Sequence, residues 1–315
     1  MPAYLDNAAT TRVCPEAARA ALEVMTEGFG NPSSGHAAGR AAAARLAEDR
    51  AVVAQRLGCA AEELYFTSCG TEGDNWSIRA AMEFNKRRGR HIVVSAIEHS
   101  AVLEPVRALA AQGCEVTYLK PDKSGRIRCE DLQAALRPDT ALVSLMLVNN
   151  ELGTLQPVRQ AAEAIRRSGC PALLHTDAVQ AFLKVPFTPA ELGADLLTVS
   201  GHKIRAPKGI GVQYVRRGLE PSPLLLGGGQ EQGRSDRGPR RRLPRLGRFL
   251  PGSPVRAETV CAGNPRGRPR PGGGLRRRRP PYLCRQPARL PQRDAGTGPE
   301  RPGCIRLLRL RLPQG

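Results

Sequence analysis

Short apolar stretches alternate with helix-like stretches along the first two thirds of this chain of 315 residues. The apolar stretches predict strands at 64–67, 91–95, 115–119, 141–148, 172–175, 194–199 and 211–215. The stretches between and before them predict helices at 15–28, 36–57, 71–88, 100–112, 130–136 and 158–168. Strands joined by helices pair in parallel, and the helices cover the sheet. The pattern therefore predicts an α/β fold, with a mostly parallel sheet and helices on both faces.

Charge divides the chain into two parts. Residues 234–315 hold 22 arginines, no lysine and four acidic residues, and so account for nearly all of the net charge of +19. Residues 1–233 are close to neutral. The high content of arginine, proline and glycine predicts disorder in the tail. The basic charge is therefore a property of the tail and says nothing about what the first part binds.

Several protein classes are disfavoured. No apolar run approaches the about 18 residues of a membrane-spanning helix, and the first residues lack the basic and apolar regions of a signal peptide. The nine cysteines form no C-x-x-C pairs. We therefore expect a cytoplasmic protein without a membrane segment, metal site or disulfide framework.

A lysine follows one of the predicted strands. The strand at 194–199 runs into Ser200-Gly201-His202-Lys203, and Lys203 is one of only six lysines in the chain. Open α/β sheets bind ligands at the carboxyl ends of their strands. A lysine that is partly desolvated there can form a Schiff base with an aldehyde.

An aspartate follows the preceding strand. Asp177 lies 26 residues before Lys203, at what we expect to be a neighbouring strand end. It could simply cap a helix. A carboxylate beside a lysine-bound aldehyde is, however, what pyridoxal phosphate requires, because the carboxylate keeps the pyridine nitrogen protonated and the ring then accepts electrons. Polar residues also follow other strands, at 67–72, 98–100 and 149–151, where each could equally form a turn or cap.

These residues together resemble the cysteine desulfurases, pyridoxal-phosphate enzymes of the aspartate-aminotransferase fold (fold type I). The matching motifs lie at 4–11, 31–36, 66–68, 71–72, 98–99, 149–153, 175–180, 200–204, 207–211 and 227–231. They occur in the family's order and at similar spacing. The resemblance implies three parts: 1–14 as the N-terminal segment of a small domain, 15–233 as the cofactor-binding large domain, and 234–315 as the tail.

The resemblance also implies a role for residues around the cofactor ring. Lys203 would bond the aldehyde, Asp177 would pair with the pyridinium nitrogen, and Gln180 would contact the phenolic oxygen. His99 would stack on the ring and help to move protons. Asn150 would lie beside the ring and the substrate.

Four residues would hold the cofactor's phosphate, namely Gly70, Thr71, Ser200 and His202. The implied reaction converts L-cysteine to L-alanine and leaves the sulfur as an enzyme persulfide, for transfer to a sulfur acceptor or an iron–sulfur scaffold protein. Family members of this kind are homodimers. The catalytic residues would be Lys203 and His99.

Two other functions remain open. One is a selenocysteine lyase or another fold-type-I enzyme. The other is an inactive cofactor-binding protein whose arginine-rich tail binds the phosphates of nucleic acid. The tail contains only Phe249 and Tyr282 as aromatic residues and no nucleic-acid module, so we favour the enzyme and do not expect nucleic acid as a partner.

The sequence departs from the family in three ways. Cys69 stands where the family usually has glycine. Arg205-Ala206 stands where the family usually has an aromatic or polar residue followed by glycine. The resemblance ends near Gly233, before the family's Arg-Ser-Gly-Thr segment, its carboxylate-binding arginine and its loop cysteine. The small domain is thus incomplete, and we expect impaired activity. We interpret 234–315 as an out-of-frame translation of a desulfurase C-terminus, because codons can be chosen for two of its stretches that read as family segments after a shift of one nucleotide.

Overall fold

A computed structural model describes residues 3–225, 227 and 231, which all belong to one compact unit. The tail at 234–315 lies outside the described residues, so the expectations of disorder, frameshift and absent nucleic-acid binding stay predictions. The boundary predicted at residue 14 also stays a prediction. Within the described part of the chain, no helix combines the length and apolarity needed to cross a membrane.

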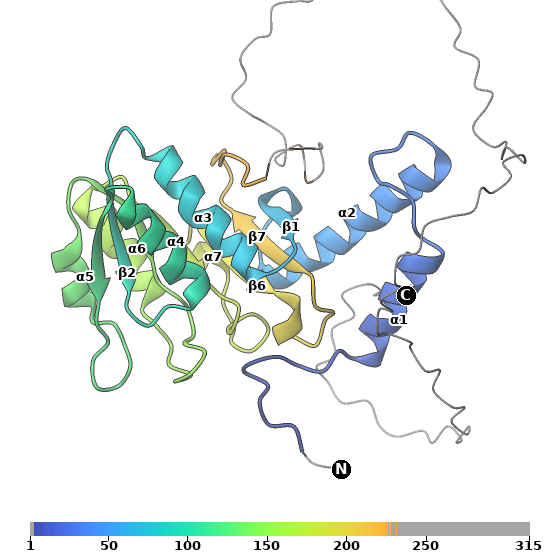
Figure 1. Cartoon of the computed structure of the whole chain (residues 1–315), viewed down its shortest axis with the longest axis horizontal. Coiled ribbons are helices and arrows are strands. Elements are labelled where there is room, and N and C mark those ends of the chain that lie inside the picture. Colours follow the sequence, from blue (N-terminus) through green and yellow to red (C-terminus); the bar gives the residue numbers. More distant parts are fainter. Residues whose placement is uncertain (1–2, 226, 228–230, 232–315) are drawn as a thin grey trace, which may run out of the picture. The chain divides into compact units, whose positions relative to one another are not determined.

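Seven strands form a single sheet (Figure 1). They are β1 (Leu64–Thr67), β2 (His91–Ser95), β3 (Glu115–Leu119), β4 (Thr140–Ser144), β5 (Leu173–Asp177), β6 (Leu196–Ser200) and β7 (Gly211–Val215). The strand order is β1-β7-β6-β5-β4-β2-β3. All neighbouring strands pair in parallel except β7, which is antiparallel to both β1 and β6. The mostly parallel sheet is therefore confirmed, and six carboxyl ends point to one edge.

The described residues form seven α-helices, and all of them except α1 pack against one face or the other of the sheet. They are α1 (Pro15–Thr26), α2 (Ala37–Leu57), α3 (Gly70–Phe84), α4 (Ser100–Ala111), α5 (Cys129–Ala135), α6 (Val158–Ser168) and α7 (Pro189–Leu192). Successive strand residues serve opposite faces. Ile92 and Val94 belong to a core cluster with α3 and α4, whereas Val93 belongs to a second cluster with α2, α5 and α6. Burial on both faces explains why the strands read as continuous apolar runs.

Most predicted boundaries lie within two residues of the observed ones, and two ends differ by four residues. The helix α3 ends at Phe84 rather than at residue 88, because the next residue, Asn85, turns its side chain inward to hydrogen-bond the carbonyls of Ala141 and Pro171. The strand β4 ends at Ser144 rather than at residue 148. Beyond it the chain still hydrogen-bonds β5 through the N–H groups of residues 145 and 147, but it then turns away from the sheet.

The short helix α7 was not predicted. A capping box begins it: Thr188 Oγ1 accepts a hydrogen bond from the Glu191 N–H at 3.1 Å, and the Glu191 carboxylate accepts one from the Thr188 N–H at 3.0 Å. Gly193 ends the helix with a φ of 67°, a left-handed conformation that glycine adopts without strain. One turn is too short to give a helical pattern in the sequence.

Candidate active site

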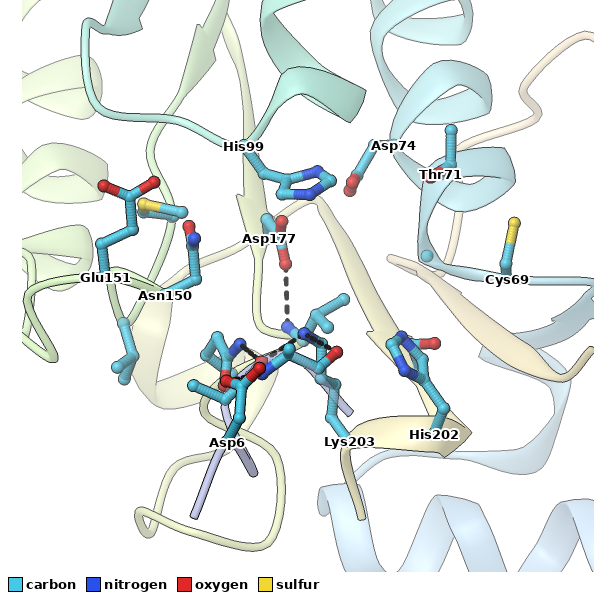
Figure 2. A pocket seen from close by; sticks show the side chains of 18 residues that line it. Asp6, Cys69, Thr71, Asp74, His99, Asn150, Glu151, Asp177, His202 and Lys203 are labelled. Atoms are coloured by element: carbon cyan, nitrogen blue, oxygen red, sulfur yellow. Dashed lines mark hydrogen bonds between the residues drawn. The ribbon is translucent and has the colours of Figure 1, made fainter. Parts of the chain in front are cut away.

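A cavity of about 550 Å³ lies at the carboxyl edge of the sheet (Figure 2). It is lined by Asp6, Ala8, Ala9, Cys69, Gly70, Thr71, Asp74, His99, Met146, Val148, Asn150, Glu151, Asp177, Val179, Gln180, Ser200, His202 and Lys203. These residues follow five different strands and include the N-terminal segment. The structure thus brings all nine predicted site residues to one cavity, although they span more than 130 positions of the sequence.

Lys203 enters the cavity from a 3-10 turn, Gly201–Lys203, directly after β6. Its Nζ donates hydrogen bonds to the carbonyl oxygens of Ala8 and Ala9, the latter at 2.9 Å. Partial burial lowers the pKa of the amine, while the charges of Asp177 and Asp6 act in the opposite direction. A lowered pKa increases the fraction of neutral amine, which is the form that attacks a carbonyl carbon.

Asp177 ends β5 and is 6% exposed. One carboxylate oxygen accepts a hydrogen bond from the Val179 N–H at 2.8 Å. Burial, and next the charge of Asp74, raises the pKa of Asp177 to about 7. A buried carboxylate gains most from a cationic partner, because little water is present to solvate its charge.

His99 and Gln180 lie on two sides of the cavity. His99 caps α4, and its Nδ1 accepts a hydrogen bond from the Ala101 N–H at 3.1 Å. In the neutral ring the proton is therefore on Nε2. Gln180 donates to the Ala8 carbonyl at 2.8 Å and accepts from Lys184 Nζ at 2.9 Å. Figure 2 shows the His99 ring above the Asp177 carboxylate, with Asn150 to one side of it.

The turn from β1 to α3 forms the opposite end of the cavity from Asn150. Thr67 Oγ1 donates to the Cys69 carbonyl at 3.0 Å, and Glu72 accepts from both the N–H and the hydroxyl of Ser68, at 2.7 and 2.6 Å. These bonds hold the first turn of α3 against the cavity. Unpaired N–H groups at a helix N-terminus attract anions, phosphate in particular.

Comparison with known proteins gives the family. Residues 3–241 match the aminotransferase class-V family. The chain belongs to this family. A cysteine desulfurase IscS of Methanosarcina thermophila is 46% identical over 231 residues, which are 73% of this chain and 57% of that protein. The chain therefore spans little more than half the length of such curated relatives.

Solved structures agree with this class-V assignment. A NifS-like protein matches with a TM-score of 0.73 and 39% identity, over 76% of this chain and 66% of that one. A structure described as SspA in complex with cysteine matches with a TM-score of 0.70 and 36% identity, over 74% and 67% of the two chains. These neighbours have the fold-type-I architecture that the sequence predicted.

Class-V aminotransferases bind pyridoxal phosphate, and the cavity fits this cofactor. Ser200 is 3% exposed, and its Oγ has no hydrogen-bond partner among the described residues. A buried hydroxyl without a partner is costly, so a ligand oxygen at this point would stabilise the site. A Cβ added to Gly70 would lie 3.0 Å from Val179 Cγ2, so the backbone of this helix start lies close to the cavity wall. The hydroxyl and the N-terminus of α3 suit a phosphate, while Lys203 and Asp177 suit an aldehyde and a ring nitrogen.

Three buried titratable residues in and beside this class-V site had no predicted role, although two of them belong to the motifs at 98–99 and 175–180. Asp74 lines the cavity from α3, and its Oδ1 lies 3.4 Å from Nε2 of His175, which is completely buried. Burial raises the pKa of Asp74 to about 7 and lowers that of His175 to about 4. Glu98 accepts from Ser95 Oγ at 2.5 Å and from the Met146 N–H at 2.8 Å, and burial raises its pKa to about 8. The sequence signal that could have identified Asp74 is its place on the apolar side of a predicted helix, three positions after Thr71.

The N-terminal segment also contributes more than the sequence indicated. Thr11 donates both its N–H and its hydroxyl to the His202 carbonyl, at 2.9 and 2.7 Å. Thr10 Oγ1 lies 3.1 Å from His202 Nδ1, and the Cys14 N–H donates to the Arg205 carbonyl at 3.0 Å. The segment therefore fixes the loop that presents Lys203 to the cavity.

Proposed function

We propose that the chain binds pyridoxal 5′-phosphate through Lys203 and, as part of a complete enzyme, acts on L-cysteine as a desulfurase. The observation that carries this proposal is the convergence of the amine of Lys203, the buried carboxyl of Asp177 and an anion-binding helix start on one cavity. The relatives described as cysteine desulfurases, and the neighbour solved with cysteine, support the choice of substrate.

Each side chain has a physical task in this proposal. When bound, pyridoxal phosphate supplies an aldehyde for an amine and a ring that accepts electrons from bonds at the substrate Cα. Asp177 would accept a hydrogen bond from the protonated ring nitrogen of the bound cofactor. Lys203 Nζ holds or releases a proton on the substrate side, which its lowered pKa favours. His99 presents Nε2–H to the cavity, as its Nδ1 is engaged by the Ala101 N–H.

Other features of the family belong to the same proposal. Sulfur would pass from the enzyme to an acceptor or iron–sulfur scaffold protein, the enzyme would be a homodimer, and its location would be the cytoplasm.

The N-terminal segment supports the assignment of Lys203, because two of its carbonyl groups hold the amine at the cavity wall.

Cofactor attachment tests the proposal. The purified full chain, mixed with pyridoxal phosphate, should develop the absorption band of lysine-bound cofactor near the visible edge. Borohydride should then fix the cofactor to the peptide that contains Lys203. The variant Lys203→Ala should lose the band, whereas Lys208→Ala should keep it, because Lys208 is exposed and does not line the cavity. A band that survives in Lys203→Ala would disprove the assignment.

A further inference from the structure

Cys69 carries a thiol at the end of the cavity that is suited to a phosphate. It is the residue before the first turn of α3 and lines the cavity together with Gly70 and Thr71. Figure 2 shows its sulfur on this side of the cavity. Among the cysteines that the structure describes, Cys69 alone lines this cavity. Its side chain is half-buried, so a small reagent in the cavity can reach it.

The backbone of Cys69 cannot move aside to make room for a larger side chain. Its carbonyl accepts hydrogen bonds from Thr67 Oγ1 at 3.0 Å and from the Gly73 N–H at 3.3 Å. Gly211 of β7 lies directly behind it: a Cβ added there would be 2.7 Å from the Cys69 carbonyl carbon. The backbone that carries the thiol is therefore held beside the cavity, and the sulfur, which accepts a hydrogen bond from the exposed Ser68 hydroxyl at 3.7 Å, can carry an added group into the cavity.

Ser200 independently identifies this end as a ligand site. Its hydroxyl is buried and lacks a partner among the described residues. Its Cβ lies 3.5 Å from the position of a Cβ added to Gly70, so the hydroxyl-bearing residue and the start of α3 are adjacent. A phosphate held there and a substituent on Cys69 would need the same space.

The remaining described cysteines are less suited to such a role. Cys14 is 1% exposed and Cys170 is 9% exposed, so both are shielded from reagents. Burial raises the pKa of the Cys59 thiol to about 12, which keeps it protonated and unreactive. Cys114 and Cys129 are half-buried like Cys69, but neither lines this cavity; Cys114 lines a different one, bounded by α3, α4 and the residues just before β2 and β3.

We propose that Cys69 is a thiol–disulfide modification site that controls loading of the cofactor. The inference rests on the proposed binding of pyridoxal phosphate in this cavity. In the cofactor-free chain the Cys69 sulfur attacks a low-molecular-weight disulfide. A new S–S bond joins Cys69 to one half, the old S–S bond breaks, and the other half leaves as a thiol that takes the Cys69 proton. Cys69 is oxidised and the leaving half is reduced, and a dithiol reverses the step.

The test compares cofactor-free and cofactor-loaded samples of the full chain. Both are incubated with glutathione disulfide, and peptide mass spectrometry measures the adduct on Cys69. We expect the cofactor-free chain to gain the adduct and the loaded chain to gain it at least ~10-fold more slowly, as the ligand covers the thiol. Modified chain should bind pyridoxal phosphate about 10-fold more weakly or not at all, since phosphate binding at the α3 N-terminus is blocked. Dithiothreitol should restore binding.

Two variants make the outcome specific. Cys69→Gly removes the thiol and should bind the cofactor equally well before and after exposure to the disulfide. Cys114→Ser removes a comparably exposed thiol from another cavity and should behave like the unaltered chain. Equal adduct formation with and without cofactor, or an adduct that leaves affinity unchanged, would overturn the inference. Failure of the reduced, unaltered chain to bind pyridoxal phosphate would instead overturn the proposed function, and the inference with it.

Discussion

Asp74 and Asp177 are two buried carboxyl groups of one cavity, and the charge of Asp74 affects the pKa of Asp177. Burial raises the pKa of both to about 7, and the charge of Asp74 contributes to the shift of Asp177. In the cofactor-free chain Asp177 therefore gains its negative charge only as the pH rises towards 7. Affinity for a ligand with a cationic ring nitrogen should fall as the pH drops through this range, since the neutral carboxyl attracts it less.

The variant Asp74→Asn should move the midpoint of that fall to lower pH by ~1 unit, because removal of a nearby like charge lowers the pKa of Asp177. Pyridoxal-phosphate affinity, titrated by absorbance at a series of pH values, measures the midpoint. Glu72→Gln is the matched control, as this carboxylate lies on the same helix but caps Ser68 outside the cavity. An unchanged midpoint in Asp74→Asn would show that Asp74 does not set the charge of Asp177.

Site residues were predictable at or shortly after the end of a predicted strand, whereas His175 and Asp74, in the middle of a strand and of a helix, were given no role. Lys203, Asp177 and His99 each come directly after an apolar run, so the sequence alone places them at the carboxyl edge. His175 lies inside β5 and Asp74 inside α3. Their contact at 3.4 Å joins residues about 100 positions apart, and no local pattern reports such a contact. Their pKa values depend on burial, which only the assembled fold determines.

At the scale of elements, one side chain joins α3 to two segments of the sheet layer. Asn85 is fully buried, and its Nδ2 donates to the carbonyl oxygens of Ala141 and Pro171, both at 2.8 Å. We predict that Asn85→Ala lowers the free energy of unfolding by about 2–4 kcal/mol, because two buried carbonyl groups lose a donor and a cavity forms. Denaturant unfolding of the full chain, followed by circular dichroism, measures this loss.

A substitution at an exposed position of α3 is the control for Asn85→Ala. Glu83 pairs with Lys86 at the surface, and such pairs contribute about 0–1 kcal/mol, so Glu83→Ala should be nearly neutral. Equal losses in both variants would contradict a special role for Asn85.

The Asn85 side chain also explains why the end of α3 was predicted wrongly. Residues 85–88 have good helix formers among them, but the partners of Asn85 lie far away in the sequence and override local preference.

At the scale of the whole molecule, we expect the chain to bind the cofactor but to release little sulfur from L-cysteine. The described residues contain the cavity and its amine, whereas no segment of 234–315 matches the family's loop cysteine or its carboxylate-binding arginine. We predict that the full chain shows the lysine-bound cofactor band but releases sulfide from L-cysteine at least ~100-fold more slowly than an intact relative, since the sulfur-accepting nucleophile is missing. Sulfide release at a comparable rate, lost in Lys203→Ala, would prove this wrong.

The composition of residues 234–315 leads to a prediction about the gene. Arginine without lysine, among many prolines and glycines, is what GC-rich codons encode when they are read out of register. When suitable codons are chosen and shifted by one nucleotide, residues 243–249 can read Phe-Pro-Ala-Leu-Gly-Ala, which resembles the family segment after Arg-Ser-Gly-Thr. The same shift lets 303–312 read Ala-Ala-Ser-Gly-Ser-Ser-Ala-Cys-Ala-Ser, close to the family's persulfide loop.

Two family segments that emerge in order from one common shift are hard to obtain by chance. We therefore predict that a single-nucleotide change near codon 233 separates the cofactor-binding part from its original reading frame. Resequencing the gene from codon 225 onward tests this. The plus-one frame should be open and should encode the loop cysteine, and restoring it should restore sulfide release to the chain. Stop codons in that frame, or no codons for the Ser-Gly-Ser-Ser-Ala-Cys loop, would refute the frameshift, and the tail would then be a genuine product of its gene.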